Sequence, residues 1–278
     1  MTTLRKQIKK WFYGSCPFFS GSFPYFGTRV YFPSRSHIFN LACEQTVYEP
    51  LNLQLISTLL KSDTVYFDVG ANIGLLSAPL LNSHPSCKVV SIEPSPNALP
   101  FLMRTYESSK FKDRWCIIGK ALGKSIGSLD FFIASADLGA FDGLKDSGRA
   151  GETRKITVPV TTLDAEWEAM GKPPVSVVKI DVEGAEIHTL EGAISCISSE
   201  KPYILLEWNL MNLRANDCSV CSLLEFAKKI NYKVFSILEQ PTTSHRYFLN
   251  IDFVPITDCV TLQIQMLSTE NFLLVSNS

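Results

Sequence analysis

The sequence has no long apolar run and no excess of basic residues. No segment approaches the roughly eighteen consecutive apolar residues that suggest a membrane-spanning helix, so we expect no transmembrane segment. The formal net charge is −1, with 26 basic and 27 acidic residues. Because modules that bind nucleic acid usually carry a basic surface, this balance disfavours a DNA or RNA partner.

The eight cysteines show no regular spacing. Cys218 and Cys221 form one C-x-x-C pair, but no second Cys or His pair follows to complete a zinc site. Near the N-terminus, basic residues precede an aromatic segment broken by prolines, which does not resemble the apolar stretch of a signal peptide. We therefore expect free thiols, no bound metal and a cytoplasmic protein.

The most informative segment spans residues 64–74 and reads Thr-Val-Tyr-Phe-Asp-Val-Gly-Ala-Asn-Ile-Gly. An apolar run at 65–67 ends in an acidic residue and a glycine-rich turn, and a helical pattern begins at Ile73. This order predicts a buried strand that leads into a helix through a tight loop. The backbone N–H groups of such a loop face a ligand.

The spacing within this turn is D-x-G-x-N-x-G. In a dinucleotide-binding fingerprint the last glycine comes five residues after the first, whereas Gly74 comes four residues after Gly70. The carboxylate of Asp68 just upstream suits a cationic ligand better than a pyrophosphate. S-adenosylmethionine, which carries a sulfonium, fits this pattern. The predicted cofactor-binding residues of the turn are Asp68, Gly70, Ala71, Asn72 and Gly74.

A second acidic residue follows about twenty positions further on, at the distance typical of a nucleotide-binding βαβ unit. Residues 88–92 form another short apolar strand, which ends at Glu93. A carboxylate at the tip of this strand can accept hydrogen bonds from both ribose hydroxyls. Together with the glycine turn, Glu93 predicts a Rossmann-like nucleoside site.

Strand and helix signals alternate from Lys88 onward, which predicts an α/β fold with a doubly wound, mostly parallel sheet of about seven strands. We expect an N-terminal extension and lead-in helix at 1–62, a Rossmann-like domain at 63–258 and a C-terminal tail at 259–278. After the first strand, we expect strands at 88–92, 115–118, 175–180, 203–208, 233–238 and 251–255, with extended segments at 129–133 and 155–160.

The N-terminal extension is rich in aromatic residues, with eleven between Trp11 and Phe39. Three prolines interrupt any long helix there. Aromatic density without periodicity predicts a segment that covers a cleft or contacts a partner, including a second copy of the chain. A simple wrap over the core is an equally good interpretation. The Gly- and Asp-rich insertion at 137–149 is either a mobile substrate loop or a polar hairpin tip.

Residues 177–186 place charged side chains at the end of an expected central strand. In open α/β sheets, ligands bind outside the carboxyl ends of the strands, where Asp181 and Glu183 lie. Lys179 interrupts a buried strand, which is costly unless its ammonium meets a carboxylate. Partners for Lys179 could come from Asp181, Glu183, Glu49 or Glu207.

Five segments together resemble the FkbM family of S-adenosylmethionine-dependent methyltransferases, over about residues 44–256. These segments span residues 67–74, 91–94, 161–164, 178–186 and 204–209. The resemblance implies a Rossmann-like class I methyltransferase that methylates a hydroxyl of a sugar, glycan or secondary metabolite. It further implies that Asp68, Gly70, Asn72, Gly74 and Glu93 hold the cofactor, and that Lys179, Asp181 and Glu183 border the acceptor.

An alkyl hydroxyl is a poor nucleophile until its proton is accepted, and a carboxylate within hydrogen-bond reach can accept it. Asp181 is the first candidate for this base and Glu183 the second. A divalent ion held by Asp181, Glu207 and Asn209 is a less favoured alternative. Two other functions stay open: a nicotinamide-dependent oxidoreductase, which the glycine spacing disfavours, and a catalytically silent cofactor-binding partner domain, which the intact acidic residues disfavour.

Overall fold

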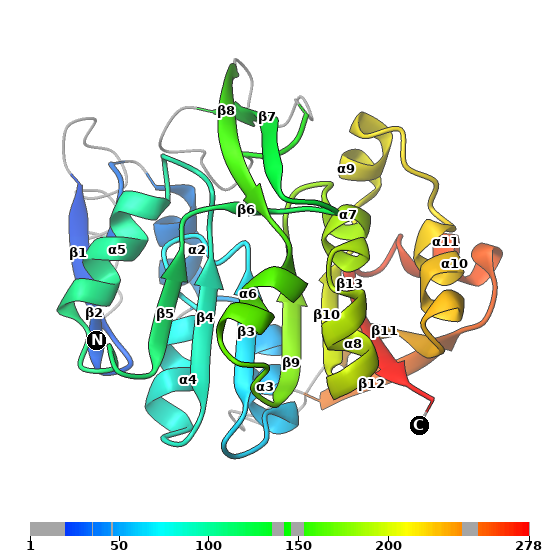
Figure 1. Ribbon diagram of the computed structural model, residues 1–278, viewed down its shortest axis with the longest axis horizontal. Coiled ribbons are helices and arrows are strands. Elements are labelled where there is room, and N and C mark those ends of the chain that lie inside the picture. The colour runs from blue at the N-terminus through cyan, green and yellow to red at the C-terminus, as the bar shows by residue number, and fades with distance from the viewer. Residues whose placement is uncertain are drawn as a thin grey trace.

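The computed structural model describes residues 20–34, 36–45, 47–134, 142–145, 153–240 and 250–277. Its centre is an eight-stranded sheet in the order β12-β11-β13-β10-β9-β3-β4-β5 (Figure 1). The strands are β3 (Val65–Val69), β4 (Lys88–Ile92), β5 (Trp115–Ile118), β9 (Val175–Ile180), β10 (Tyr203–Glu207), β11 (Tyr232–Gln240), β12 (Asn250–Ile256) and β13 (Asn271–Ser276).

The five strands from β10 to β5 are parallel, while β13 runs antiparallel to both of its neighbours. This confirms the expected α/β fold with a mostly parallel, doubly wound sheet. The expected strand count of seven is one too few, because the segment expected as a C-terminal tail contributes β13 to the sheet.

The last twenty residues differ from the expected tail. Residues 259–265 form helix α11 (Cys259–Gln265), and β13 lies between β10 and β11 in the sheet. Phe272 and Leu274 in β13 are fully buried. A short apolar run near the end of a chain does not show from its own pattern that it fills a gap between two earlier strands.

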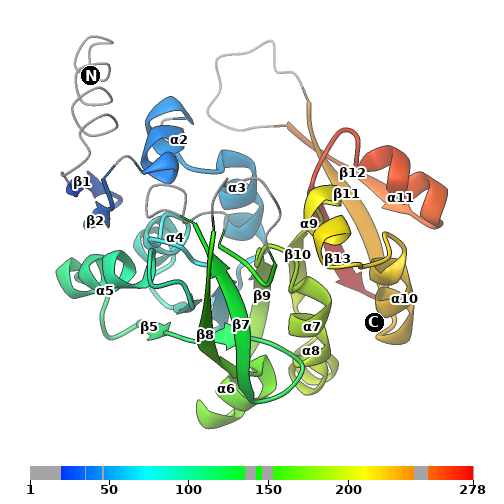
Figure 2. The same cartoon turned by 90° about the horizontal axis from the view of Figure 1, so that it is seen from above.

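Helices cover both faces of the sheet, each over its own apolar cluster (Figure 2). Successive residues of β3 point to opposite faces, so that Phe67 belongs to one cluster and Tyr66 to the other. A strand buried on both faces explains the continuous apolar run in the sequence. One face holds α2 (His37–Gln45), α3 (Pro50–Leu59), α4 (Ser77–Ser83) and α5 (Leu99–Ser108); the other holds α6 (Leu163–Ala169), α7 (Glu186–Glu191), α8 (Ile194–Glu200) and α10 (Ser222–Lys229).

The described part of the aromatic N-terminal segment forms a hairpin, β1 (Gly21–Tyr25) and β2 (Thr28–Phe32), that packs beside α5. The N–H of Tyr31 donates to the hydroxyl of Thr105 in α5 at 3.1 Å. Phe32 stacks on Phe39 with ring centroids 4.0 Å apart. These rings are part of the core. Trp11, Phe12, Tyr13, Phe18 and Phe19 lie outside the described residues.

A second, three-stranded sheet projects beyond the carboxyl ends of the large sheet (Figure 1). It consists of β6 (Ala121–Leu122), β7 (Gly127–Ile133) and β8 (Arg154–Thr161). The extended segments expected near 129–133 and 155–160 therefore pair with each other in this sheet. Gly143, from the segment between β7 and β8, bridges to Phe132. The rest of the 137–149 insertion, apart from 142–145, lies outside the described residues.

Cys221 and Cys259 form a disulfide that joins the start of α10 to the start of α11, with the two Cα atoms 5.5 Å apart. The prediction of free thiols is wrong for this pair, because the fold brings together residues 38 positions apart. Cys87, Cys116, Cys196 and Cys218 are free.

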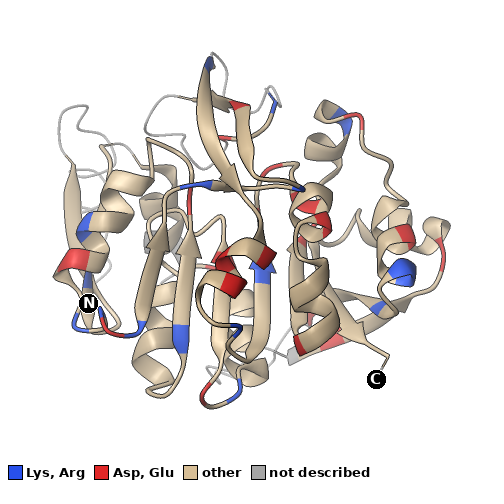
Figure 3. Ribbon diagram, viewed as in Figure 1, with Lys and Arg blue, Asp and Glu red and all other residues tan. Residues whose placement is uncertain are grey.

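Charged residues of both signs are distributed over many elements of the described part of the chain (Figure 3). None of the helices in the described ranges is long and apolar enough to cross a membrane.

Candidate active site

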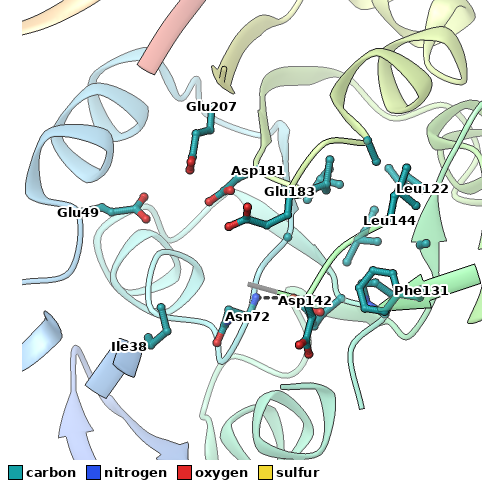
Figure 4. A pocket seen from close by; sticks show the side chains of 18 of the residues that line it. Ile38, Glu49, Asn72, Leu122, Phe131, Asp142, Leu144, Asp181, Glu183 and Glu207 are labelled. Atoms are coloured by element: carbon teal, nitrogen blue, oxygen red, sulfur yellow. Dashed lines mark hydrogen bonds between the residues drawn. The ribbon is translucent and has the colours of Figure 1, made fainter. Parts of the chain in front are cut away.

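A cavity of about 230 Å³ opens at the carboxyl ends of β3, β4, β9 and β10. We call one side the carboxylate end, because it holds Glu49, Asp181, Glu183 and Glu207. The opposite side, the apolar end, holds Ala121, Leu122, Phe131 and Leu144, together with Asp142. Asn72 and Glu93 also line the cavity, and Figure 4 shows the carboxylates at the left and centre, the apolar side chains at the right and Asn72 below them.

The glycine turn serves mainly to hold the protein's own groups. The N–H groups of Gly70 and Ala71 both donate to the carbonyl oxygen of Ile92, at 3.0 and 3.1 Å. The N–H of Asn72 donates to Glu93 Oε2 at 2.8 Å. The expectation that these amides face a ligand is therefore wrong, since all three have partners within the protein.

Gly70 allows the turn to approach the end of β9 very closely. Its φ is +81°, and a Cβ placed there would lie 1.7 Å from the carbonyl oxygen of Asp181. No side chain fits in that space. Glycine is therefore required at this position to place the two strand ends, and with them Asp181, beside each other.

Glu93 is buried, and its carboxylate is held by two backbone donors. Oε2 accepts from Asn72, and Oε1 accepts from the N–H of Ser95 at 2.9 Å. Burial raises the pKa of Glu93 to about 7, and these two hydrogen bonds oppose the rise. Each oxygen keeps a second acceptor position, so the carboxylate can receive two neighbouring hydroxyls such as those of a ribose.

Lys179 is buried behind Asp181. Its Nζ lies 2.8 Å from Asp181 Oδ2 and 4.0 Å from Glu49 Oε2. Burial favours the neutral amine, but the carboxylates of Asp181, Glu49 and Asp68 outweigh this and hold the pKa of Lys179 above its ordinary value. Lys179 is thus an ammonium that fixes and balances Asp181. It contacts a small pocket behind the turn and does not line the main cavity.

Three of the predicted cofactor residues also lie away from the main cavity. Asp68 is buried beneath the turn, where it accepts from the hydroxyls of Ser77 at 2.5 Å and Tyr66 at 3.1 Å. Ala71 lines the small pocket with Asp68. Gly74, with φ +89°, faces the side chains of Leu102 and Trp115. Of the predicted set, the main cavity brings together Gly70, Asn72, Glu93, Asp181 and Glu183.

Glu207 ends β10 and shares a hydrogen bond with Asp181. Two carboxyl groups can form this bond only with a proton between them. The neighbouring Asp181 and burial both raise the pKa of Glu207 well above its ordinary value. Glu207 therefore holds its proton to a higher pH than an ordinary glutamic acid does.

Three residues around the cavity have left-handed backbone conformations that favour glycine. They are Glu49 at φ 43°, Asn72 at φ 48° and Glu183 at φ 51°. Each costs on the order of 1–3 kcal/mol unless its surroundings compensate. The side chain of Glu183 is also held, since Oε2 accepts from Asn212 Nδ2 at 2.6 Å. Six other described non-glycine residues, none of which lines this cavity, also have a positive φ, so the conformation by itself does not mark the site.

The sequence interpretation did not place Tyr48, Glu49 and Asp142 in the site, and it placed Glu207 there only as a ligand of the alternative metal site, although all four line the cavity. Glu49 and Glu207 did carry a signal, because each was a candidate partner for Lys179. Nothing in the Gly- and Asp-rich insertion distinguished Asp142 from the other acidic residues there.

The alternative metal site receives no support from Asn209. Its Oδ1 accepts from the N–H groups of Met211 and Asn212 and caps α9 (Leu210–Ala215). Its amide contacts Glu270. Among the described residues, no three His, Cys, Asp or Glu side chains are grouped so that they could hold a metal ion.

Replacing Glu207 by Gln should make the stability of the protein less dependent on pH. Above the ordinary pKa of 4.5, the unfolded chain releases the Glu207 proton and the folded protein keeps it. Folding stability then falls with rising pH, by up to about 1.4 kcal/mol per pH unit, until the folded-state pKa is passed. Gln keeps a donor toward Asp181 and does not titrate, so the variant should be more stable than the wild type at pH 8.

Urea unfolding at pH 5 and pH 8 measures this difference. The advantage of Glu207→Gln should shrink at pH 5, and Glu225→Gln on the exposed side of α10 should show no such pattern. An advantage for Glu207→Gln of equal size at both pH values would contradict a shared proton.

Strand order and site together define the class of protein. An antiparallel strand inserted beside the last parallel ones, and acidic residues at the tips of β4 and β9, are features of a Rossmann-like class I methyltransferase. A family model described as "Methyltransferase FkbM domain" matches residues 68–232, more than half of the chain. The chain belongs to this family and is a methyltransferase.

Individual relatives are distant. The chain is 23% identical over 188 residues to the 2-O-methyltransferase NoeI of Sinorhizobium fredii (strain NBRC 101917 / NGR234), covering 62% of this chain and 74% of that protein. The crystal structure of methyltransferase FkbM from Methylobacillus flagellatus KT is similar with a TM-score of 0.48 and 21% identity, over 85% of this chain and 52% of that one. The chain thus spans about half the length of that protein.

A precorrin-6y C5,15-methyltransferase from Geobacter metallireducens GS-15 is similar with a TM-score of 0.42 and 14% identity, over 82% of this chain and 86% of that one.

Proposed function

We propose that the protein transfers a methyl group from S-adenosylmethionine to a hydroxyl group of a neutral, polyhydroxylated acceptor such as a sugar. One observation carries this proposal. The same cavity is lined by two carboxylates with different roles. Glu93 is oriented by backbone donors and can accept hydrogen bonds from a ribose, and Asp181 is oriented by Lys179 and can accept a proton.

The cavity suits a cationic nucleoside cofactor. Glu93 offers one acceptor position on each oxygen, which matches the two hydroxyls of a ribose. The nearby carboxylates favour the positive charge of a sulfonium and disfavour the pyrophosphate of a nicotinamide dinucleotide. When bound, S-adenosylmethionine supplies an activated methyl group; the residues of the chain align the acceptor and handle its proton.

Asp181 is placed to accept the proton of the acceptor hydroxyl. Lys179 and Glu207 hold its carboxylate from two sides, so its direction is fixed before the acceptor binds. In an in-line displacement, most of the rate enhancement comes from aligning the hydroxyl oxygen with the methyl group. Acceptance of its proton makes the hydroxyl oxygen a better nucleophile. Glu183, held by Asn212, is placed to accept a hydrogen bond from a second hydroxyl.

The charge of the carboxylate end supports a neutral acceptor. Four carboxyl groups gather there, and none of the described residues that line the main cavity is a Lys or Arg. A phosphate or carboxylate on the acceptor would be repelled, whereas sugar hydroxyls can donate to the carboxylates. The relative NoeI is named as a 2-O-methyltransferase, which agrees with transfer to a hydroxyl.

Calorimetry with the Glu93→Gln variant tests the cofactor assignment. The amide keeps the size of the side chain but replaces one acceptor oxygen by a donor, which then faces a backbone N–H and a ribose hydroxyl. We expect the affinity for S-adenosylhomocysteine to fall about 10- to 100-fold, the effect of losing a hydrogen bond to a charged group.

The exposed Glu168→Gln variant, which lies in a surface ion pair with Lys172, should bind like the wild type. Unchanged affinity in Glu93→Gln, or tighter binding of NAD than of S-adenosylhomocysteine by the wild type, would refute the assignment.

A further inference from the structure

One wall of the main cavity comes from the N-terminal part of the chain. Helix α2 contributes Ile38, and the turn before α3 contributes Tyr48 and Glu49. These residues precede position 68, where the match with the family model begins. Figure 4 shows Ile38 and Glu49 at the left, with the side chain of Glu49 extending toward Asp181. This N-terminal wall therefore borders the acceptor side of the cavity.

The carboxylate of Glu49 is held by two side chains. Its Oε2 accepts from Asn52 Nδ2 at 2.9 Å, and the phenol of Tyr48 donates to the same carboxylate. Asn52 is 6% exposed and also donates to Asn271 Oδ1 at 3.1 Å. The Oδ1 atom of Asn52 is buried and has no hydrogen-bond partner among the described residues.

An unpaired buried oxygen is rare in a folded protein and calls for an explanation. A carboxylate can only accept hydrogen bonds, so Asn52 has to turn its NH₂ group toward Glu49 and its oxygen away. The orientation that leaves this oxygen without a partner is therefore the one that fixes Glu49. The fold maintains a buried unpaired group in order to hold a carboxylate on the cavity wall.

The N-terminal hairpin fixes the backbone of the same turn. Tyr25 in β1 is 7% exposed, and its hydroxyl accepts from the N–H of Tyr48 at 3.2 Å. The ring of Tyr25 contacts those of Phe23 and Phe26, with ring centroids 5.7 and 4.8 Å away. The aromatic hairpin is thus linked through Tyr25 and Tyr48 to the residue that presents its carboxylate to the cavity.

Glu49 and Asp181 lie close together, because both face the ammonium of Lys179. The Nζ atom is 2.8 Å from Asp181 Oδ2 and 4.0 Å from Glu49 Oε2. The side chain of Glu49 is 23% exposed and lines the main cavity, whereas that of Lys179 is 6% exposed and does not. A ligand in this part of the cavity meets two carboxylates side by side, which suit two neighbouring hydrogen-bond donors.

We propose that Glu49 binds the hydroxyl adjacent to the one that is methylated, so that the protein acts on vicinal diols and methylates one hydroxyl of the pair. This proposal rests on the proposed transfer to a hydroxyl and adds the residue that selects the acceptor. The attacking oxygen bonds to the methyl carbon as the carbon–sulfur bond breaks, and its proton passes to Asp181. Glu49 takes part in no bond change. Tyr25 and Asn52 are positioning residues for Glu49.

An isolated hydroxyl gives Glu49 no donor in place of the water that the acceptor displaces, and an unpaired, desolvated acceptor group lowers affinity. Acceptors without a neighbouring hydroxyl are therefore disfavoured. The product carries a methyl ether next to an unmodified hydroxyl. A further hydroxyl of the acceptor can reach Glu183.

Periodate tests the requirement for a diol, because it cleaves the bond between two adjacent hydroxyl-bearing carbons and leaves isolated hydroxyls intact. One half of an extract of glycans and metabolites is oxidised with periodate and reduced with borohydride, and both halves are freed of reagents. Each half is incubated with the protein and S-adenosylmethionine carrying a ¹³C-labelled methyl group. We expect most of the label transfer to be lost in the oxidised half. Addition of untreated extract to that half should restore it.

Glu49→Gln tests the residue with the same untreated extract. Asn52 continues to hold the oxygen of the amide, so an NH₂ group faces the acceptor. The half-saturating concentration of extract should rise about tenfold, the effect of losing a hydrogen bond to a charged group. The rate at saturation, the affinity for S-adenosylhomocysteine and the melting temperature should stay near the wild-type values. Tyr25→Phe should shift half-saturation in the same direction by less, and Glu107→Gln, exposed on α5, should not shift it.

Undiminished transfer to the oxidised extract would overturn the requirement for a diol. Wild-type half-saturation in Glu49→Gln would remove Glu49 from acceptor binding, and a lower melting temperature without a shift in half-saturation would leave it a structural partner of Lys179. A fall in affinity for S-adenosylhomocysteine in this variant would assign Glu49 to the cofactor and overturn the proposal as well. No transfer by the wild type to any component of the untreated extract would instead contradict the proposed function.

Discussion

Asp181→Asn should lower the single-turnover rate of methyl transfer by about 10²- to 10⁴-fold, the usual contribution of a positioned base. The affinity for S-adenosylhomocysteine should change little, because Asp181 faces the acceptor side of the cavity. Asn keeps the size of the side chain and its oxygen can still accept from Lys179, but it cannot take a proton from the acceptor hydroxyl. Rapid-quench measurement with saturating S-adenosylmethionine gives this rate directly.

The competing account of Asp181 is purely structural, since it pairs with buried Lys179 at 2.8 Å. That account predicts a lower melting temperature and, for the folded fraction, a normal rate. Glu183→Gln is the matched control, and its rate should fall less, because Glu183 orients a hydroxyl without taking its proton. A folded Asp181→Asn enzyme with a near-normal rate would show that Asp181 is not the base, and Glu183 or Glu207 would then be the candidates.

Lys179→Met should lower the free energy of unfolding by about 3–5 kcal/mol, the typical cost of removing one partner from a buried ion pair. The variant leaves the carboxylates of Asp181, Glu49 and Asp68 without their common cation. Burial raises the pKa of Asp68, so its protonation relieves part of the repulsion and the loss should be smaller at pH 5 than at pH 8. Urea unfolding at both pH values measures it.

Lys155→Met is the control for this loss of charge. Lys155 pairs with Asp130 at 2.6 Å, and both side chains are 57% exposed. Exposed pairs contribute about 0–1 kcal/mol, so this variant should be nearly as stable as the wild type. Equal losses in the two lysine variants would contradict the idea that the buried cluster depends on Lys179.

Local patterns predicted much of the fold and the main acidic residues of the site. Glu93, Asp181 and Glu183 follow strands whose apolar runs are clear in the sequence, and parallel strands end at the same edge of a sheet. Their convergence on one cavity follows from that rule. Buried Lys179 was likewise predictable as a paired ammonium, because its position in an apolar strand requires a counter-charge.

The purpose of the glycine turn was less predictable. The sequence indicates a tight turn, but not that its amides bind Ile92 and Glu93 in place of a ligand. Nor does it show that Gly70 is required by the carbonyl of Asp181, more than a hundred residues away. The first fact depends on how β3 meets β4 and the second on how β3 meets β9, and no local pattern contains either.

Three further features depend on contacts between distant segments. β13 fills a gap between strands formed much earlier in the chain, and Cys221 meets Cys259 because α10 and α11 begin near each other. Asp142 reaches the cavity because β7 and β8 pair in a separate sheet. An insertion rich in glycine and aspartate gives no sign of which of its acidic residues will be buried.

The central claim is that a methyl group moves from S-adenosylmethionine to a hydroxyl oxygen of a neutral acceptor. The most direct measurement incubates the protein with S-adenosylmethionine carrying a ¹³C-labelled methyl group and an extract of glycans and metabolites. The labelled products are then separated by ion exchange and identified by NMR. We predict that the label appears in a methyl ether of an uncharged, polyhydroxylated product, with an equal amount of S-adenosylhomocysteine. Label on nitrogen or carbon, or only in products that an anion exchanger retains, would contradict the account.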